Sequence, residues 1–361
     1  MQPWILHLPA NRTRRGYRGG LMLDRFEGAA QPVDNDRPED WVASLVPARN
    51  PGLPPIENEG LARVPGPDGQ FVLLKSLVER DPVHFLGADN VQKHGTSPTF
   101  LVKLLDSAIR LHVQAHPTRA LAQQYLNAPF GKLECYHILD ARPGIKPYIR
   151  LGFQHPPSPS EFKRVVMAQD IAAMDAWFEP VPVKPGETWL VQGGLPHAIG
   201  EGVLMVEIME PSDLSVRFEF ERAGIVVPPE ARFLGRDIDF AMNILDFSKL
   251  TVSSARNKCN LKPRIIKKDK TCIEEILVDD DRVDCFRVKK ITAISRTTVP
   301  KGQHLLVGIV IQGSGTMNVH GEAVQVAKGS KVLVPAAAAS MDLTPGGNGP
   351  MVVLACTPGS F

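Results

Sequence analysis

Hydrophobic and polar residues alternate in many short segments of this chain, and glycine or proline residues separate those segments. The clearest case is the segment 110–117, where polar and apolar residues take turns: His112, Gln114 and His116 against Leu111, Val113 and Ala115. Because successive side chains of a strand face opposite ways, the three polar side chains are predicted to share one face. Short strands with close turns favour a β-sandwich or jelly roll decorated with helices.

Helical spacing is confined to a few places in the chain. Ser158 or Ser160 and Pro159 are typical of a helix start, and apolar residues then recur at helical spacing as far as Met174. A second helix is expected over 233–246. A segment rich in Ser, Asn and Lys follows it, so we predict a first domain over 1–250, a linker over 251–270 and a second domain over 271–361.

A weak internal repeat relates these two domains. The segment 186–197 and the segment 329–340 both pass from a turn glycine through an apolar strand to a turn of small residues. In this register His197 of the first copy corresponds to Ser340 of the second. Both copies resemble the second cupin motif, so we expect a mainly β fold of two cupin-type jelly-roll barrels, with a few helices decorating the first. The second barrel is expected to lack metal ligands and to play a structural part.

Composition narrows the function classes. The 361 residues include 41 Lys and Arg against 39 Asp and Glu, and a net charge of +2 points to neither nucleic acid nor an anionic membrane. The five cysteines form no CxxC pair and their number is odd, which suits a reducing compartment. The N-terminal residues have the wrong order for a signal peptide. We therefore expect a cytoplasmic protein that is a monomer or a homodimer.

Four residues of the first domain are candidate metal ligands: Gln114, His116, Glu134 and His197. Two imidazoles, a carboxylate and an amide oxygen suit Zn(II), and are also compatible with Mn(II), Fe(II), Co(II) or Ni(II). Any one of them alone is more simply read as an ordinary polar residue of a β-barrel. Their joint occurrence on strand-like segments favours a metal site.

Several segments resemble the signatures of class I mannose-6-phosphate isomerases, a zinc-dependent cupin-type family. They follow one another in order, within a resemblance that spans most of residues 15–250: 114–117, 131–135, 196–200 and 207–217. The resemblance implies one Zn²⁺ per chain, held by Gln114, His116, Glu134 and His197. It also implies interconversion of mannose 6-phosphate and fructose 6-phosphate through an enediol.

The resemblance further implies catalytic roles for Arg217, Lys132 and Glu207, without deciding which group is the proton-transfer base. Lys103 and His112 are the residues expected to meet the sugar phosphate. His112 departs from the small hydroxyl residue common in the family, and Thr118 departs from an acidic one, which leaves the identity of the sugar phosphate open.

Three alternatives stay open at this point. One is an isomerase of a different sugar phosphate. The second is a non-catalytic metal-binding cupin that binds a sugar or a sugar phosphate. The third is a metal-dependent oxygenase, which would require iron or copper and consume oxygen.

Overall fold

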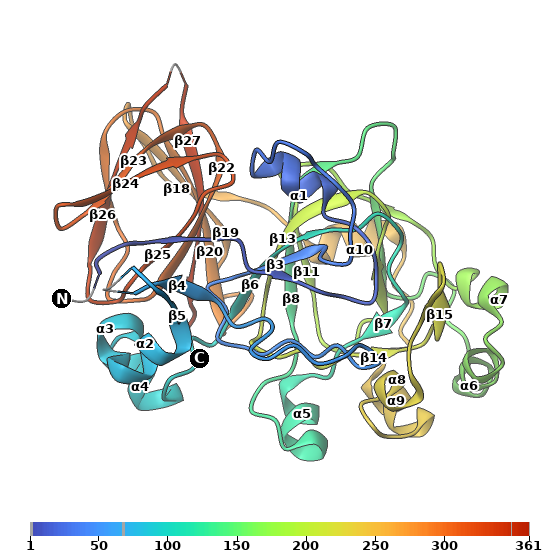
Figure 1. Cartoon of the computed structure of the whole chain (residues 1–361). Helices are drawn as coiled ribbons and strands as arrows, with labels where there is room; N and C mark the ends of the chain where they lie inside the picture. Colours follow the sequence, from blue (N-terminus) through green and yellow to red (C-terminus); the bar gives the residue numbers. More distant parts are fainter. Residues whose placement is uncertain (1–2, 67–68, 348, 361) are drawn as a thin grey trace.

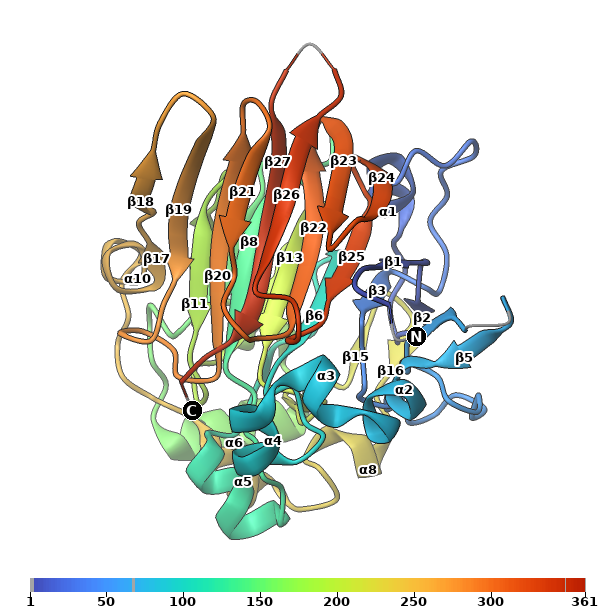
Figure 2. The same cartoon turned by 90° about the vertical axis from the view of Figure 1, so that its left-hand side faces the viewer.

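The computed structural model describes residues 3–66, 69–347 and 349–360, so the predicted domain limits at residues 1 and 361 lie outside it. Figure 1 shows two β-rich units side by side, with most helices gathered around the unit built from the earlier part of the chain. In Figure 2 the strands of both units stand roughly upright, and helices cluster below their lower ends.

The first unit contains two antiparallel sheets that face each other. The seven-stranded sheet has the order β17-β11-β8-β13-β6-β3-β2, and the five-stranded sheet has the order β10-β9-β12-β7-β14. The bounds in the larger sheet are β2 Arg12–Thr13, β3 Glu39–Val42, β6 Leu101–Asp106, β8 Glu134–Ala141, β11 Thr188–Val191, β13 Val203–Met209 and β17 Asn260–Leu261. Those in the smaller sheet are β7 Gln114–Ala115, β9 Tyr148–Leu151, β10 Val181–Pro182, β12 His197–Ile199 and β14 Val216–Arg217.

The second unit also has two antiparallel sheets, with the orders β1-β25-β22-β27-β20-β19-β18 and β21-β26-β23-β24. The larger sheet contains β1 Leu6–Leu8, β18 Arg264–Lys268, β19 Cys272–Val278, β20 Phe286–Ala293, β22 Leu306–Gln312, β25 Lys331–Val334 and β27 Met351–Pro358. The smaller contains β21 Thr297–Pro300, β23 Ser314–Val319, β24 Glu322–Ala327 and β26 Ser340–Pro345. The N-terminal strand β1 therefore pairs with a strand from near the other end of the chain.

Short helices and two hairpins complete the described structure. The helices are α1 Leu21–Phe26, α2 Leu74–Arg80, α3 Pro82–Leu86, α4 Ala88–His94, α5 Arg119–Leu126, α6 Pro159–Ala168, α7 Ile171–Asp175, α8 Pro229–Arg232, α9 Ile238–Ile244 and α10 Val252–Cys259. The hairpins pair β4 Arg63–Pro65 with β5 Phe71–Leu73, and β15 Glu221–Arg222 with β16 Ile225–Val226. No helix within the described residues is long and apolar enough to cross a membrane.

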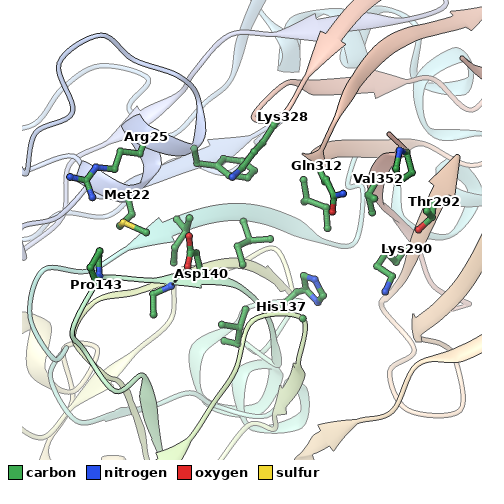
Figure 3. A pocket seen from close by; sticks show the side chains of 18 residues that line it. Met22, Arg25, His137, Asp140, Pro143, Lys290, Thr292, Gln312, Lys328 and Val352 are labelled. Carbon is green, nitrogen blue, oxygen red and sulfur yellow. Dashed lines mark hydrogen bonds between the residues drawn. The ribbon is translucent and has the colours of Figure 1, made fainter. Parts of the chain in front are cut away.

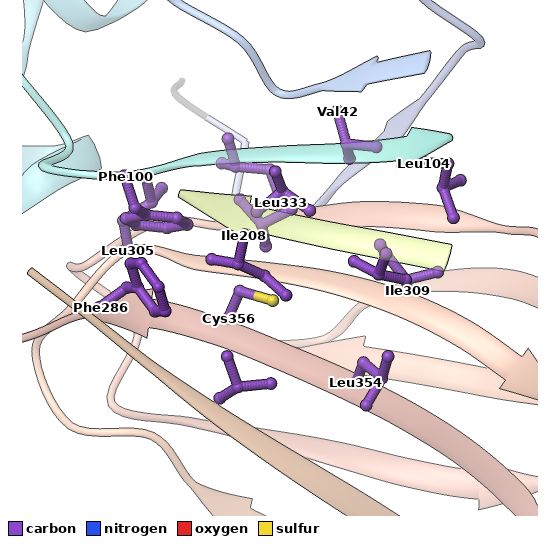
Figure 4. Close-up of a cluster of buried hydrophobic side chains, with 14 of the residues drawn as sticks. Val42, Phe100, Leu104, Ile208, Phe286, Leu305, Ile309, Leu333, Leu354 and Cys356 are labelled. Atoms are coloured by element: carbon purple, nitrogen blue, oxygen red, sulfur yellow. The ribbon is translucent and has the colours of Figure 1, made fainter. Parts of the chain in front are cut away.

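A hydrophobic layer joins the two units (Figure 4). Val42, Leu104 and Ile208 of the first unit pack in it with Phe286 and Leu354 of the second. Successive side chains of a strand face opposite ways, so the residues next to those in this layer point away from it. On β13 the neighbour of Ile208 is Glu207, which is thereby directed into the interior of the first unit.

The structure confirms the mainly β fold with two jelly-roll units and differs from the prediction in local detail. Within the segment 110–117 the paired strand, β7, contains two residues only, Gln114 and Ala115. The helix expected as far as Met174 is broken at Gln169, whose φ of 51° ends α6 before Asp170 caps α7. The predicted linker contains α10, β17 and β18, and the domain limits at 250 and 271 stay a prediction.

Candidate metal centre and active site

Three of the predicted ligands meet where the two sheets of the first unit come together. His197 of β12 lies directly across from Gln114 of β7 in the smaller sheet, and Glu134 is the first residue of β8 in the larger one. The ligand atoms of His116, Glu134 and His197 all lie within 4.8 Å of one another. All three side chains are buried.

The backbone fixes which nitrogen of each imidazole carries the proton. Nδ1 of His116 lies 2.9 Å from the carbonyl oxygen of Leu214, and Nδ1 of His197 lies 2.9 Å from that of Leu195. A carbonyl oxygen can only accept a hydrogen bond, so each Nδ1 donates and each Nε2 of the neutral ring is left as a bare electron pair. Histidines that bind a metal are commonly oriented in this way.

These bare nitrogens face a carboxylate. Nε2 of His116 lies 3.0 Å from Oε1 of Glu134, and Nε2 of His197 lies 3.5 Å from Oε2. Burial, and then Lys132, lower the pKa of His116 to about 3, and burial also lowers the pKa of His197. Burial acts to raise the pKa of Glu134, but Lys132 and His116 outweigh it and hold that pKa well below its usual range. Two imidazole electron pairs and a carboxylate thus converge on one point, an arrangement that suits a bound cation.

Lys132 supplies part of that positive charge. Its Nζ lies 2.9 Å from Oε1 of Glu134 and 3.3 Å from Nε2 of His116. Even so, Oε1 of Glu134 is buried and has no well-directed hydrogen bond from a described residue. An orphaned carboxylate oxygen beside two bare imidazole nitrogens fits a divalent metal ion with nitrogen and oxygen ligands.

Gln114 reaches the same cluster with its amide in a definite orientation. Oε1 accepts a hydrogen bond of 2.8 Å from Ser215, and Nε2 lies 3.4 Å from Nε2 of His197. An amide nitrogen is not a metal ligand, so Gln114 can complete the set through oxygen only after its amide turns over. The predicted fourth ligand is therefore in place, but its amide N–H group, and not its amide oxygen, faces the site.

Glu207 lies beside this cluster on β13 and is almost completely buried. Burial, and then the charge of Glu134, raise its pKa to about 8. A carboxyl group with such a pKa is mainly protonated near neutrality and can both give and take a proton. Tyr136 donates a hydrogen bond of 2.5 Å to Oε2 of Glu134 and so fixes the second oxygen of that carboxylate.

Lys103 lies deeper in the interior than its predicted role requires. Its Nζ is 3.6 Å from a carboxylate oxygen of Glu39 and 3.6 Å from one of Glu207, and it lies over the ring of Trp41 at 4.4 Å. Arg15 continues this network through a hydrogen bond of 3.0 Å to Asp213 and an ion pair of 3.3 Å with Glu39.

Sequence reasoning assigned no role to Arg15, Glu39 or Asp213. Arg15 lies in an N-terminal segment without helical or strand periodicity, which gave no signal. The buried carboxylate Glu39 beside Trp41 was the one available hint.

A cavity of about 410 Å³ opens next to these groups. Lys103, His112, Gln114, Lys132, Glu207 and Arg217 all line it. Burial, and then Arg15, lower the pKa of Arg217 to about 10, and its side chain makes one long hydrogen bond of 3.4 Å to the carbonyl of Ala231. The structure thus places all five predicted catalytic and binding residues around one space.

A larger cavity of about 630 Å³ lies between the two units (Figure 3). His137, Asp140, Lys290 and Gln312 are among the residues that line it, and none of the four predicted ligands does. The smaller cavity is the candidate active site, because Gln114 and Lys132 of its wall contact the cluster of His116, Glu134 and His197.

Comparisons with known proteins agree with this geometry. No family model matches the chain. The chain is 27% identical over 241 residues to the probable mannose-6-phosphate isomerase GmuF of Bacillus subtilis, an alignment that covers 65% of this chain and 69% of that protein. The chain is also 30% identical over 161 residues to the mannose-6-phosphate isomerase of Streptococcus mutans, an alignment that covers 43% of this chain and 49% of that protein.

Two solved structures show the same fold over nearly the whole chain. The mannose 6-phosphate isomerase of Bacillus subtilis aligns with a TM-score of 0.75 and 19% identity, over 98% of this chain and 99% of its own. A mannose 6-phosphate isomerase with zinc bound aligns with a TM-score of 0.72 and 15% identity, over 99% and 100% of the two chains.

The departure from the family pattern at Thr118 has a local explanation. Its hydroxyl accepts a hydrogen bond of 3.3 Å from the backbone of Leu121 and caps α5, as threonine commonly does. The departure at His112 lies on the cavity wall itself. Of the two, His112 therefore bears more directly on what the cavity of this chain accepts.

Proposed function

We propose that this chain is a zinc-dependent aldose-ketose isomerase that interconverts mannose 6-phosphate and fructose 6-phosphate. The observation that carries the proposal is the convergence of two bare imidazole nitrogens and the orphaned oxygen of Glu134. Similarity to proteins named mannose-6-phosphate isomerases supports the substrate class, and the cavity beside these residues supplies the space for it.

His116, Glu134 and His197 would hold the metal, with Gln114 as a fourth ligand once its amide oxygen faces inward. A divalent cation at this position supplies positive charge against the negative charge that develops on the sugar oxygens during enolisation. Two imidazoles, a carboxylate and an amide oxygen can also bind other divalent first-row metals, so the choice of zinc is itself part of the proposal.

In the proposed mechanism Glu207 carries the proton between the two carbons. As a carboxylate it removes the proton from C2 of the open-chain aldose. The electron pair of that C–H bond forms the C1=C2 double bond of the enediol, the C1=O pair moves to O1, and O1 takes a proton from water. In the second half Glu207 returns its proton to C1, the C1=C2 pair forms the new C1–H bond, and O2 gives its proton to water as the C2 carbonyl of the ketose forms. Lys132 faces the same oxygens as a fixed positive charge, and we assign ring opening to Arg217.

The departure at His112 supports a second candidate of the same class, an isomerase of another sugar phosphate. The imidazole is larger than the hydroxyl residue common at this position and fills part of the cavity wall. A panel of aldose and ketose phosphates, assayed alongside mannose 6-phosphate, separates the two candidates. Cytoplasmic location and a monomeric or dimeric state remain predictions beside this proposal.

The decisive experiment measures conversion of mannose 6-phosphate to fructose 6-phosphate by zinc-loaded protein, together with its metal content. His116→Ala and a chelated sample should lose activity. His155→Ala is the matched control, because this histidine is exposed and pairs with Glu179 far from the cluster, and it should keep full activity. A filled metal site without turnover of any sugar phosphate would overturn the isomerase and favour the non-catalytic cupin.

A further inference from the structure

Apart from Arg217, to which we assign ring opening, the cations that line the candidate active site fall into two groups. Arg15, Lys103 and Lys132 each lie within 4.0 Å of a carboxylate, in the ion pairs described above. Arg18 and Arg49 form no ion pair within 4.0 Å with a described carboxylate. In the first group Lys103 and Lys132 are buried and Arg15 is partly buried, at the floor of the cavity, whereas Arg18 and Arg49 are exposed at its mouth.

The floor is a poor place for the phosphate of a sugar phosphate. A phosphate beside Lys103 would also lie beside Glu39 and Glu207, whose oxygens are both 3.6 Å from its Nζ. Lys103 is 1% exposed, so the phosphate would lose its hydration there as well. A buried dianion near two carboxyl groups is strongly disfavoured.

His112 is unsuited to phosphate as well. Its side chain is buried, so a phosphate held there would lose most of its hydration. Its Nε2 lies 3.4 Å from the carbonyl oxygen of Ile225, which can only accept, so the Nε2 proton is already donated within the protein.

The mouth of the cavity offers what the floor lacks. Arg18 donates one hydrogen bond of 3.1 Å to the backbone carbonyl of Asp34, and the carboxylate of Asp34 is already held by Arg142 through both of its oxygens. The backbone N–H of Arg49 donates a hydrogen bond of 3.1 Å to Asp213, which anchors its loop against the active-site network. Among the described residues that line the cavity, Asp36 is the acidic residue at this rim.

We infer that Arg18 and Arg49 bind the phosphate group of the substrate at the mouth of the cavity, and that Lys103 and His112 do not. This inference rests on the proposed function, because it takes C1 and C2 of the sugar to lie at the metal cluster. The phosphate is at the other end of the sugar chain and therefore points outward. Guanidinium groups bind phosphate oxygens in pairs, and an exposed rim lets the dianion keep part of its hydration.

The test compares Arg18→Met, Arg49→Met and the double variant with the parent zinc-loaded protein. KM for mannose 6-phosphate should rise about tenfold in each single variant and about a hundredfold in the double variant, with kcat nearly unchanged. The affinity for inorganic phosphate, measured by calorimetry without any turnover, should fall in parallel. Arg25→Met is the matched control, since this exposed arginine lines the other cavity, and it should change neither quantity.

The outcomes separate this inference from the proposed function. Turnover with an unchanged KM in the double variant overturns the arginine site and leaves the isomerase standing. A fall in kcat without any change in KM or in phosphate affinity also overturns it, because the arginines would then act on the chemistry. If the parent protein turns over no sugar phosphate but the double variant loses phosphate affinity, the proposed function fails and the anion site stands.

Discussion

The interiors of the two barrels differ although both are built around the same strand-turn-strand motif. The first encloses the charged or ionisable side chains of Lys103, Glu134 and Glu207, all nearly inaccessible to water. The second encloses an apolar core in which Met317, Leu343 and Val353 are completely buried. Buried charges cost free energy unless they are paired, so a charged interior is retained for chemistry and an apolar one for stability.

The largest effect is expected when His197, in the first copy of the cupin-like motif, is replaced by serine, the residue at the corresponding position 340 of the second copy. His197→Ser removes one of the two bare imidazole nitrogens, and we expect metal affinity to fall by more than about a hundredfold, because loss of an outer partner alone costs 10–100-fold. Metal analysis after dialysis and the isomerase assay measure this. The reverse change, Ser340→His, should bind no metal, since Ser340 is exposed. Retained metal and activity in His197→Ser would contradict the ligand assignment.

The next effect separates catalysis from metal binding within the first barrel. Glu207→Gln keeps the size of the side chain but cannot take up a proton. If Glu207 transfers the proton, kcat should fall by about 10²–10⁴-fold, the range usual for loss of a general base. Metal content should stay unchanged, because Glu207 is not among the converging ligands. A loss of metal together with activity would instead make Glu207 a residue that supports the ligands.

The same contrast explains how much of the molecule the sequence could predict. Ligands on strands, such as His197, were found because their spacing and motif are local. Arg15 and Asp213 meet only in the folded chain, 198 residues apart in sequence, and no pattern links them. The broken helix at Gln169 was missed because helical periodicity continues across the break while the backbone does not. The buried placement of Lys103 depends on packing between strands and could not be read from its own neighbours.

A smaller effect tests the apolar interior of the second barrel. Leu343→Ala removes a completely buried side chain, and we expect the free energy of unfolding to fall by about 2–5 kcal/mol, as in other core truncations. Urea denaturation measures this loss. Zinc content and kcat at a temperature well below unfolding should not change. Loss of metal at temperatures where the variant is still folded would show that the two barrels are energetically coupled at the site.

The smallest effect concerns Lys301, a buried lysine of the second barrel without a carboxylate partner within 4.0 Å among the described residues. Its Nζ donates hydrogen bonds to the carbonyl oxygens of Gly302 and His304. Burial lowers its pKa from 10.5 to about 8, so the charged form is disfavoured in the folded state. Below pH 8 this penalty acts in full, and it fades as the pH rises from 8 to 10.5, because the unfolded chain then binds more protons than the folded one.

Lys301→Met removes that penalty together with the two hydrogen bonds. The variant should therefore be more stable than the parent at pH 7, and its advantage should shrink by about 2 kcal/mol between pH 7 and pH 10. Urea denaturation of both proteins across this range gives the difference, in which the other titrating groups cancel. A difference that is constant with pH would mean that Lys301 is solvated well enough to keep its ordinary pKa. At this position the second barrel would then carry no buried charge that opposes folding, and its interior would differ even more from the charged interior of the first barrel.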